Sequence, residues 1–238
     1  MAISGFGMIA ADTLGRPVPP PMPVTTTPPP QPEAASAVPK RDRPTSAASQ
    51  ARAQAQAPAS SPSPSLLDSR SAPTRLDIPS IGVSAPLGGV GNASNGAIDV
   101  PPANKPHLAG WYTPGATPGQ PGRTVIVGHL DSRYSGAAVF YDLGAVRRGE
   151  TVTVTRRDGI AVVYRVDGAS IQPKDQFPVD QIYAPSDRSE LRLVTCGGSF
   201  DKKIGWSDNI IVYAHMISWH RTPETRWERL LRDNVSSG

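Results

Sequence analysis

The chain has 238 residues and a net charge of +4, and its composition changes sharply along its length. Of its 27 prolines, 15 lie in residues 1–74, and that stretch holds only one of the 14 aromatic residues, Phe6. A segment with so few apolar side chains cannot offset the entropy cost of ordering its backbone, so we expect residues 1–74 to be a disordered Pro/Ala/Ser-rich tail. No window reaches the ~18 consecutive apolar residues of a membrane-spanning helix, which excludes a polytopic membrane protein. No basic run is interleaved with aromatic residues, which argues against nucleic-acid binding.

The first residues of the tail and the region after it are interpreted separately. Residues 1–11 (MAISGFGMIAA) form a short apolar run, which we interpret either as a frayed terminus or as an incomplete signal-anchor. The remaining 164 residues, 75–238, have an ordinary size for one domain with one core.

The single cysteine, Cys196, excludes an intramolecular disulfide and any Cys-based zinc or iron–sulfur site. We therefore expect no metal and no cofactor.

After residue 75 the pattern is one of short strands separated by Gly and Pro turns. Pro79 breaks the first strand, as is typical of an edge, and the continuous apolar run at 124–127 predicts a buried strand. Residues 151–155 alternate throughout, the chain turns at 157–159, and a largely apolar segment returns over 160–166, which together predict a hairpin. In chain order the predicted strands are 76–78 with 81–83, 97–100, 124–127, 151–155, 160–166, 191–195 and 210–214.

Helical signals are few and short. They cover 105–111, 137–143 and 186–190, and a cap-like Thr222-Pro223 pair predicts a short helix in a C-terminal extension over 218–238. Seven or eight strands with so few helices predict a mainly β fold, a closed or nearly closed barrel.

Two reactive residue types stand where a predicted strand ends in glycine. His129 follows the strand at 124–127 in the segment VGHLD, and Cys196 follows the strand at 191–195 in the segment VTCGG. Strand ends hold a side chain rigidly and leave it reachable, and glycine lets a substrate backbone approach closely. A thiol near neutral pH is mostly protonated, and a histidine is the usual partner that favours its thiolate. The pair predicts a thiol-based active site, whereas each residue alone could equally be a buried, inert cysteine or a structural histidine.

The other three histidines give weaker signals. None of His107, His215 and His220 has the spacing of a metal partner such as a His-Glu-x-x-His helix. No P-loop, dinucleotide fingerprint or Gly-x-Ser-x-Gly elbow occurs in the chain.

Four segments together resemble the successive motifs of sortases, and most closely those of the actinobacterial class F group. They are DIPSIGV at 77–83, GRTVIVGHLD at 122–131, LVTCGG at 193–198 and DNIIVYA at 208–214. The resemblance covers about residues 75–217 and implies a sortase-type eight-stranded β-barrel with a few short helices after the disordered tail. The order, histidine before cysteine, argues against the papain-like peptidases.

The resemblance also implies an activity. In that family a cysteine attacks the Thr–Gly bond of a Leu-Pro-x-Thr-Gly-like sorting signal, forms an acyl-thioester, and passes the protein to a cell-wall or pilin amine. Cys196 matches the nucleophile and His129 the general acid/base, and the backbone of residues 196–198 would help to hold the oxyanion. The expected partners are sorting-signal-bearing surface proteins and the acceptor amine. The expected location is the outer surface of a Gram-positive cell, reached through a membrane anchor that is incomplete in this sequence.

One position departs from the family pattern. The third catalytic residue of the family is an arginine that commonly stands just before the Asp-Asn pair, and Ser207 occupies that place here. The candidate substitutes are Arg192, which lies four residues before Cys196 and so on the same face of the strand, and the amide of Asn209. The plainer interpretations are a surface arginine and a turn residue. Besides an active transpeptidase, the sequence therefore leaves open a degenerate sortase-fold binding module, or a thiol hydrolase that does not transfer.

Overall fold

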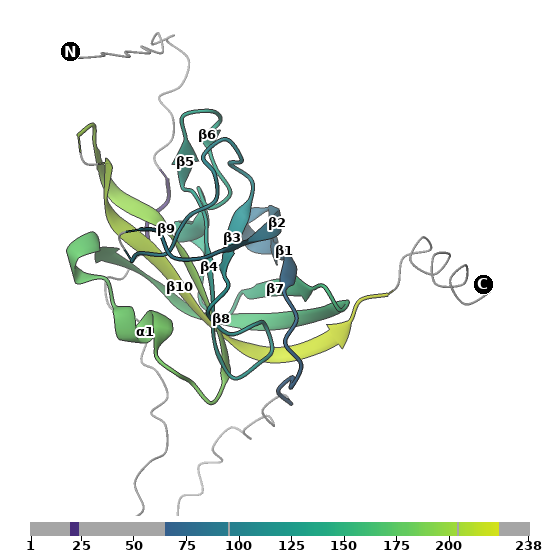
Figure 1. Cartoon of the computed structure of the whole chain (residues 1–238). Coiled ribbons are helices and arrows are strands. Elements are labelled where there is room, and N and C mark those ends of the chain that lie inside the picture. The colour runs from purple at the N-terminus through teal and green to yellow at the C-terminus, as the bar shows by residue number, and fades with distance from the viewer. Residues whose placement is uncertain (1–19, 24–64, 95, 204, 224–238) are drawn as a thin grey trace, which may run out of the picture.

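The fold is a closed barrel of eight strands, seen in a computed structural model that describes residues 20–23, 65–94, 96–203 and 205–223 (Figure 1). Around the barrel the strands follow the order β1-β2-β3-β4-β9-β10-β8-β7. The barrel strands are β1 (Pro73–Ile78), β2 (Val83–Val90), β3 (Ala109–Tyr112), β4 (Gly122–Val127), β7 (Thr151–Arg156), β8 (Ile160–Pro173), β9 (Ser189–Asp201) and β10 (Gly205–Arg221). The prediction of a mainly β, eight-stranded barrel is confirmed.

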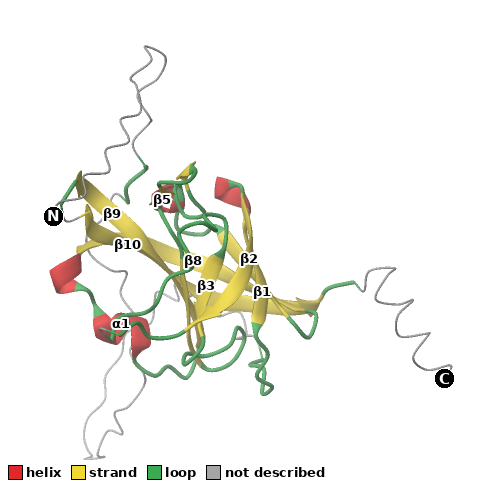
Figure 2. Ribbon diagram, turned by 45° about the horizontal axis from the view of Figure 1, so that its top comes forward, coloured by secondary structure: helices red, strands yellow, loops and turns green. Residues whose placement is uncertain are grey.

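Short elements decorate the barrel. A two-stranded ribbon pairs β5 (Asp131–Ser132) with β6 (Gly136–Ala137), and α1 (Val179–Tyr183) lies outside the barrel wall (Figure 2). Three 3₁₀ turns complete the set: η1 (Pro79–Ile81), η2 (Leu143–Ala145) and η3 (Lys174–Gln176). In the part of the chain that the structure describes, no helix is long and apolar enough to span a bilayer.

The hairpin of β7 and β8 forms where alternation predicted it. The turn closes at Gly159, whose φ of 75° suits glycine, and alternate side chains of β7 enter the barrel. β4 differs, because it is buried along nearly its whole length. One side of β4 faces the barrel interior at Ile126, and the other carries Val125 and Val127 into a second apolar cluster with Ile182 of α1. Burial on both faces explains the continuous apolar run of this strand.

Several predicted elements are wrong. Residues 97–100 form no strand, and Ile98 makes only an isolated bridge to Asn92. The predicted helix at 105–111 overlaps β3, and the one at 186–190 runs into the start of β9. The one at 137–143 runs from the end of β6 through turns to the first residue of η2. The predicted C-terminal helix lies outside the described residues.

Residues upstream of the predicted boundary at 75 already belong to the barrel and its core. β1 starts at Pro73, and Leu67 upstream of it is buried in the main core. Met22, within the short described stretch 20–23, also packs against that core. At the other end β10 continues to Arg221, beyond the predicted domain end at 217. The predicted anchor at 1–11 and most of the predicted tail lie outside the described residues.

Candidate functional site

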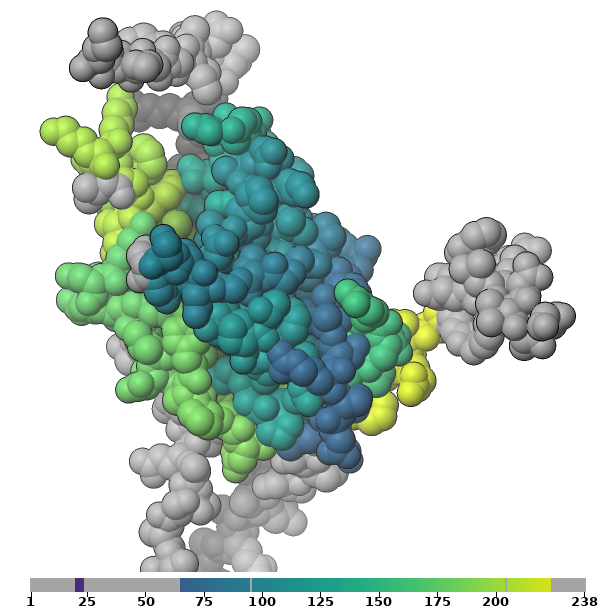
Figure 3. Space-filling view, viewed as in Figure 1, coloured from purple at the N-terminus to yellow at the C-terminus, as the bar shows by residue number. Residues whose placement is uncertain are grey.

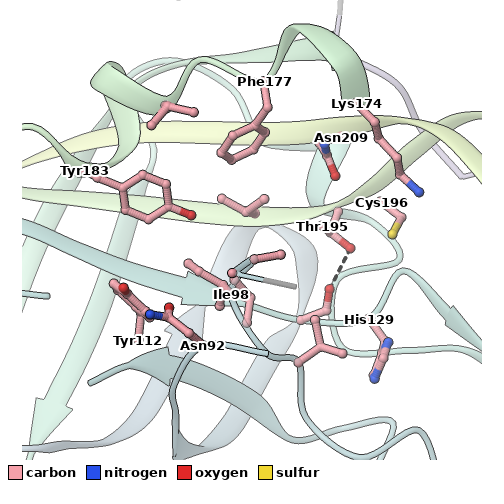
Figure 4. A pocket seen from close by; sticks show the side chains of 17 residues that line it. Asn92, Ile98, Tyr112, His129, Lys174, Phe177, Tyr183, Thr195, Cys196 and Asn209 are labelled. Carbon is pink, nitrogen blue, oxygen red and sulfur yellow. Dashed lines mark hydrogen bonds between the residues drawn. The ribbon is translucent and has the colours of Figure 1, made fainter. Parts of the chain in front are cut away.

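The two candidate catalytic residues lie just beyond the last pair of the parallel strands β4 and β9. His129 follows the end of β4, as predicted, whereas Cys196 does not follow a strand end: it lies inside β9, which continues to Asp201 by pairing with β10. β4 and β9 pair in parallel up to Val127 opposite Val194, so the residues just beyond this pair on the two chain segments lie close together. Two hydrogen bonds extend the pairing: Gly128 N donates to Val194 O at 3.1 Å, and Thr195 Oγ1 donates to Gly128 O at 2.8 Å. His129 and Cys196 therefore line one cavity of about 710 Å³ (Figure 4).

His129 is half-buried, and its ring is held by the backbone of the segment after β2. Its Nε2 lies 2.6 Å from Pro101 O. Because a carbonyl oxygen only accepts, Nε2 carries the proton, and Nδ1 is left as the ring nitrogen that can accept one. This tautomer suits a histidine that must take a proton from a neighbouring group.

Cys196 is half-buried at the cavity wall, and its thiol is free. Burial raises the pKa of the Cys196 thiol; the positive charge of Lys174 opposes that increase, and the Asp131 carboxylate adds to it. The thiol therefore needs a base or a cation before it can act as a nucleophile near neutral pH.

The glycines after the cysteine are required by their neighbours. A Cβ on Gly197 would lie 2.6 Å from Ile210 Cγ1, and Gly198 has a φ of +83° and stands against Ser207 and Asp208. The backbone of residues 196–198 can follow this path only without side chains at both positions.

The two candidate substitutes for the family arginine lie in different places. Asn209 of β10 is the cross-strand partner of Cys196 and lines the cavity. Arg192 lies on β9, and its guanidinium is used elsewhere: it forms an ion pair with Glu190, donates from Nε to Gln181 O at 2.9 Å, and stacks 5.0 Å from the Tyr213 ring. It is buried and does not line the cavity, so it is not the exposed surface residue of the plainer interpretation either. Ser207 accepts a hydrogen bond from Ser199 N at 2.9 Å.

The rest of the cavity is mostly apolar and extends away from Cys196 as a groove between two segments. The segment after β2 and the segment holding α1 lie side by side on the face drawn in Figure 3. The side chains of its walls include Ile98, Val100, Tyr112, Phe177, Val179 and Tyr183. An extended peptide is the kind of ligand that such an apolar groove beside a nucleophile can hold.

Sequence reasoning did not single out Lys174, which also lines the cavity. The strand prediction ended β8 at residue 166, whereas β8 continues to Pro173 and delivers Lys174 to the site. In the sequence, Lys174 is one lysine in a polar stretch between two late strands, and this stretch has no distinctive pattern that would mark it as part of a site.

The remaining histidines lie elsewhere. His107 lines a smaller cavity near η1, His215 pairs through Nδ1 with Asp167 at 2.7 Å, and His220 is exposed near the end of β10. Among the residues that the structure describes, no group of three His, Cys, Asp or Glu side chains could hold a metal ion.

Solved structures with a similar fold include three sortases. Sortase A from Corynebacterium diphtheriae is 21% identical with a TM-score of 0.48, and the match covers 66% of this chain and 65% of that one. A sortase from Actinomyces oris is 20% identical (TM-score 0.46; 67% and 90% covered), and sortase A from Listeria monocytogenes is 16% identical (TM-score 0.49; 67% and 94% covered). The chain thus spans just under two thirds of the Corynebacterium enzyme. A comparison with curated proteins gives no match.

The family model of the sortase domain matches residues 76–217, which contain the barrel, His129 and Cys196. Because this match extends over more than half of the chain, the chain belongs to the sortase family, whose members are generally cysteine transpeptidases.

Proposed function

We propose that this chain is an active cysteine transpeptidase of class F type, which cleaves a Leu-Pro-x-Thr-Gly-like signal and transfers the acyl part to an amine. The observation that carries the proposal is that His129 and Cys196 line one cavity, beside the last pair of β4 and β9 and at one end of an apolar groove. The substrates would be signal-bearing surface proteins, the acceptor a cell-wall or pilin amine, and the place of action the outer cell surface.

The first half-reaction would form a thioester. The thiol proton of Cys196 passes to Nδ1 of His129, and Sγ attacks the carbonyl carbon of the signal's threonine. The C–N bond of the Thr–Gly pair then breaks, and His129 gives its proton to the leaving glycine amine. Backbone N–H groups of residues 196–198 and the amide of Asn209 would hold the negative oxygen of the tetrahedral intermediate.

The second half-reaction would reverse these roles. An acceptor amine attacks the thioester carbon and gives a proton to His129, the C–S bond breaks, and Cys196 regains the proton. Water in place of the amine would give hydrolysis without transfer.

The direct test is to incubate the full chain with a panel of Leu-Pro-x-Thr-Gly-type peptides, with and without an amine, and to follow products by mass spectrometry. We expect an adduct on Cys196 equal to the acyl part of the peptide, and an amide product whose yield rises with the amine. Cys196→Ala should form neither product. Absence of both across the panel would overturn the proposal, and cleavage that ignores the amine would assign a hydrolase instead.

The second candidate is a degenerate sortase-fold binding module, which the serine at position 207 favours. Loss of an oxyanion donor typically costs about 10²–10³ in rate. This candidate predicts that the same peptides bind, measured by calorimetry, without any adduct on Cys196.

A further inference from the structure

The site must stabilise negative charge, first on sulfur and then on oxygen. His129 accounts for the proton, but the family's arginine is absent, and Arg192 is bound to Glu190 away from the cavity. Among the described residues that line the cavity, Lys174 is the one lysine or arginine. A site without any cation would leave the buried thiol mostly protonated near pH 7.

The strand pairing brings Lys174 near Ser207, the position at which the family has its arginine. In the antiparallel pairing of β8 and β10, Pro173 stands opposite Asp208 and Gln172 opposite Asn209. The ladder ends at that pair, and Lys174 is the next residue of the chain and the first of η3. Asn209 in turn stands opposite Cys196 on the other side of β10. Lys174 and Ser207 thus each adjoin the last pair of this ladder, Pro173 and Asp208.

The side chain of Lys174 points toward Cys196. In Figure 4 it descends from the segment after β8, and its ammonium group lies beside the sulfur of Cys196. Lys174 is exposed at the mouth of the cavity, so its ammonium group keeps contact with water. That position lets the side chain serve the thiol without the cost of burying a charge.

Other charged groups face the thiol from the packed elements. Asp131 of β5 is held by Trp206, whose Nε1 donates to Asp131 Oδ1 at 3.0 Å, and Asp208 of β10 stands against Gly198. The Asp131 carboxylate opposes a negative charge on Cys196, whereas Lys174 supports it. The balance at the thiol therefore depends on the lysine.

We propose that Lys174 supplies, from the start of η3 directly after β8, the positive charge that the family's arginine supplies from β10. Lys174 stabilises the thiolate of Cys196 and, during acyl transfer, the oxyanion that forms next to it. The second role rests on the proposed function, whereas the first can be measured without any peptide.

The experiment is alkylation of Cys196 by iodoacetamide, a neutral reagent, as a function of pH in the full chain. The variants are Lys174→Gln, Lys174→Arg and, as a matched control, Lys203→Gln, which removes the same charge from an exposed residue between β9 and β10 outside the cavity lining. We expect the midpoint of the K174Q profile to move to higher pH and its rate at pH 7 to fall about three- to tenfold, while K174R and K203Q follow the unmodified chain. Equal profiles for K174Q and K203Q would overturn the proposal.

Transpeptidation kinetics test the second role. K174Q should lower kcat/KM at least about tenfold, with most of the rate kept by K174R and all of it by K203Q. Ser207→Arg should gain less than about threefold, since the charge is already present. A gain of more than about tenfold in S207R would mean that the native site lacks its cation, and would overturn the proposal.

The two proposals fail separately. If no peptide reacts but K174Q still shifts the alkylation profile, the lysine's effect on the thiol stands and the transpeptidase assignment falls. If peptides react and K174Q changes neither profile nor rate, the transpeptidase stands and the inference about Lys174 falls.

Discussion

Gly128, the residue before the proposed general acid/base, has no room for a side chain. A Cβ at this position would lie 2.5 Å from Phe140 Cδ2 and 2.7 Å from Val139 Cγ1, and both of those side chains are buried. The backbone must pass this close to the core for His129 to emerge beside Cys196. The glycine is therefore part of how the barrel positions the histidine.

Gly128→Ala should destabilise the fold and displace His129. Overpacking of a filled core typically costs about 1–3 kcal/mol, so the free energy of unfolding in urea should fall by that amount. Transpeptidation should fall as well, because the added methyl group pushes the His129 backbone away from Phe140. Gly91→Ala is the control, since a Cβ there meets nothing within 4 Å. An equal, small effect of both substitutions would contradict the argument.

At the scale of elements, a buried charge network fixes α1 to the barrel. Glu190 of β9 pairs with Arg123 of β4 at 3.1 Å and also with Arg192. Both arginines continue to the backbone of the α1 region: Arg123 Nη1 donates to Asp180 O at 2.6 Å and to Ala184 O at 2.8 Å, and Arg192 Nε donates to Gln181 O. The network therefore holds the wall of the groove that carries Tyr183. Arg192 therefore contacts the α1 region and Glu190, and not the cavity that holds Cys196.

Glu190→Gln should weaken this attachment. Burial alone would raise the pKa of Glu190, but Arg192 and then Arg123 outweigh it, and the net pKa lies below its ordinary value. A carboxyl whose pKa is lowered by folding adds stability above its unfolded pKa, and loses it as the pH falls through the folded value. E190Q leaves two buried arginines without their counter-charge, so unfolding at pH 7 should be easier by about 3–5 kcal/mol.

The pH dependence of stability is a second measurement of the effect of Glu190→Gln. On acidification below about pH 4.5, the unmodified chain should lose stability more steeply than E190Q, because only the unmodified chain has this carboxylate to protonate. Asp187→Asn, which removes an exposed carboxylate three residues away, should leave both the stability at pH 7 and its acid slope nearly unchanged. Parallel curves for E190Q and the unmodified chain would count against the network.

The sequence predicts those elements whose evidence is local. β4, the β7–β8 hairpin and the cores of β9 and β10 show apolar runs or alternation, and the glycines beside His129 and Cys196 mark both residues. That β9 continues past Cys196 to Asp201 is not visible locally, because the continuation depends on pairing with β10. β3 escapes prediction because Ala109–Tyr112 becomes a strand only by pairing with β2 and β4, which are distant in sequence. α1 is a five-residue helix that tertiary hydrogen bonds stabilise. Lys174 escapes because its place depends on where β8 ends, and that is decided by pairing with the long β10.

At the scale of the whole molecule, the residues before β1 clasp three parts of the barrel. Ser65 O accepts from Trp219 Nε1 of β10 at 2.9 Å, and Leu67 N donates to Gly119 O at 2.9 Å. Arg156 at the end of β7, fully buried, donates from Nη2 to Ser69 O at 2.9 Å. β1 then closes the ring between β2 and β7. Composition could not place this boundary, because one buried leucine in a Ser-rich stretch carries little signal.

Leu67→Ala in the full chain tests whether this clasp belongs to the folded domain. Leu67 is 9% exposed and lies in the main core, whereas its neighbour Leu66 is 38% exposed. Removing a buried leucine side chain typically costs about 2–5 kcal/mol, so L67A should unfold at clearly lower urea concentration. L66A is the matched control and should change stability by less than about 0.5 kcal/mol. If L67A and L66A unfolded alike, the domain would begin at β1, near the boundary that composition suggested, and the clasp would contribute nothing to the barrel.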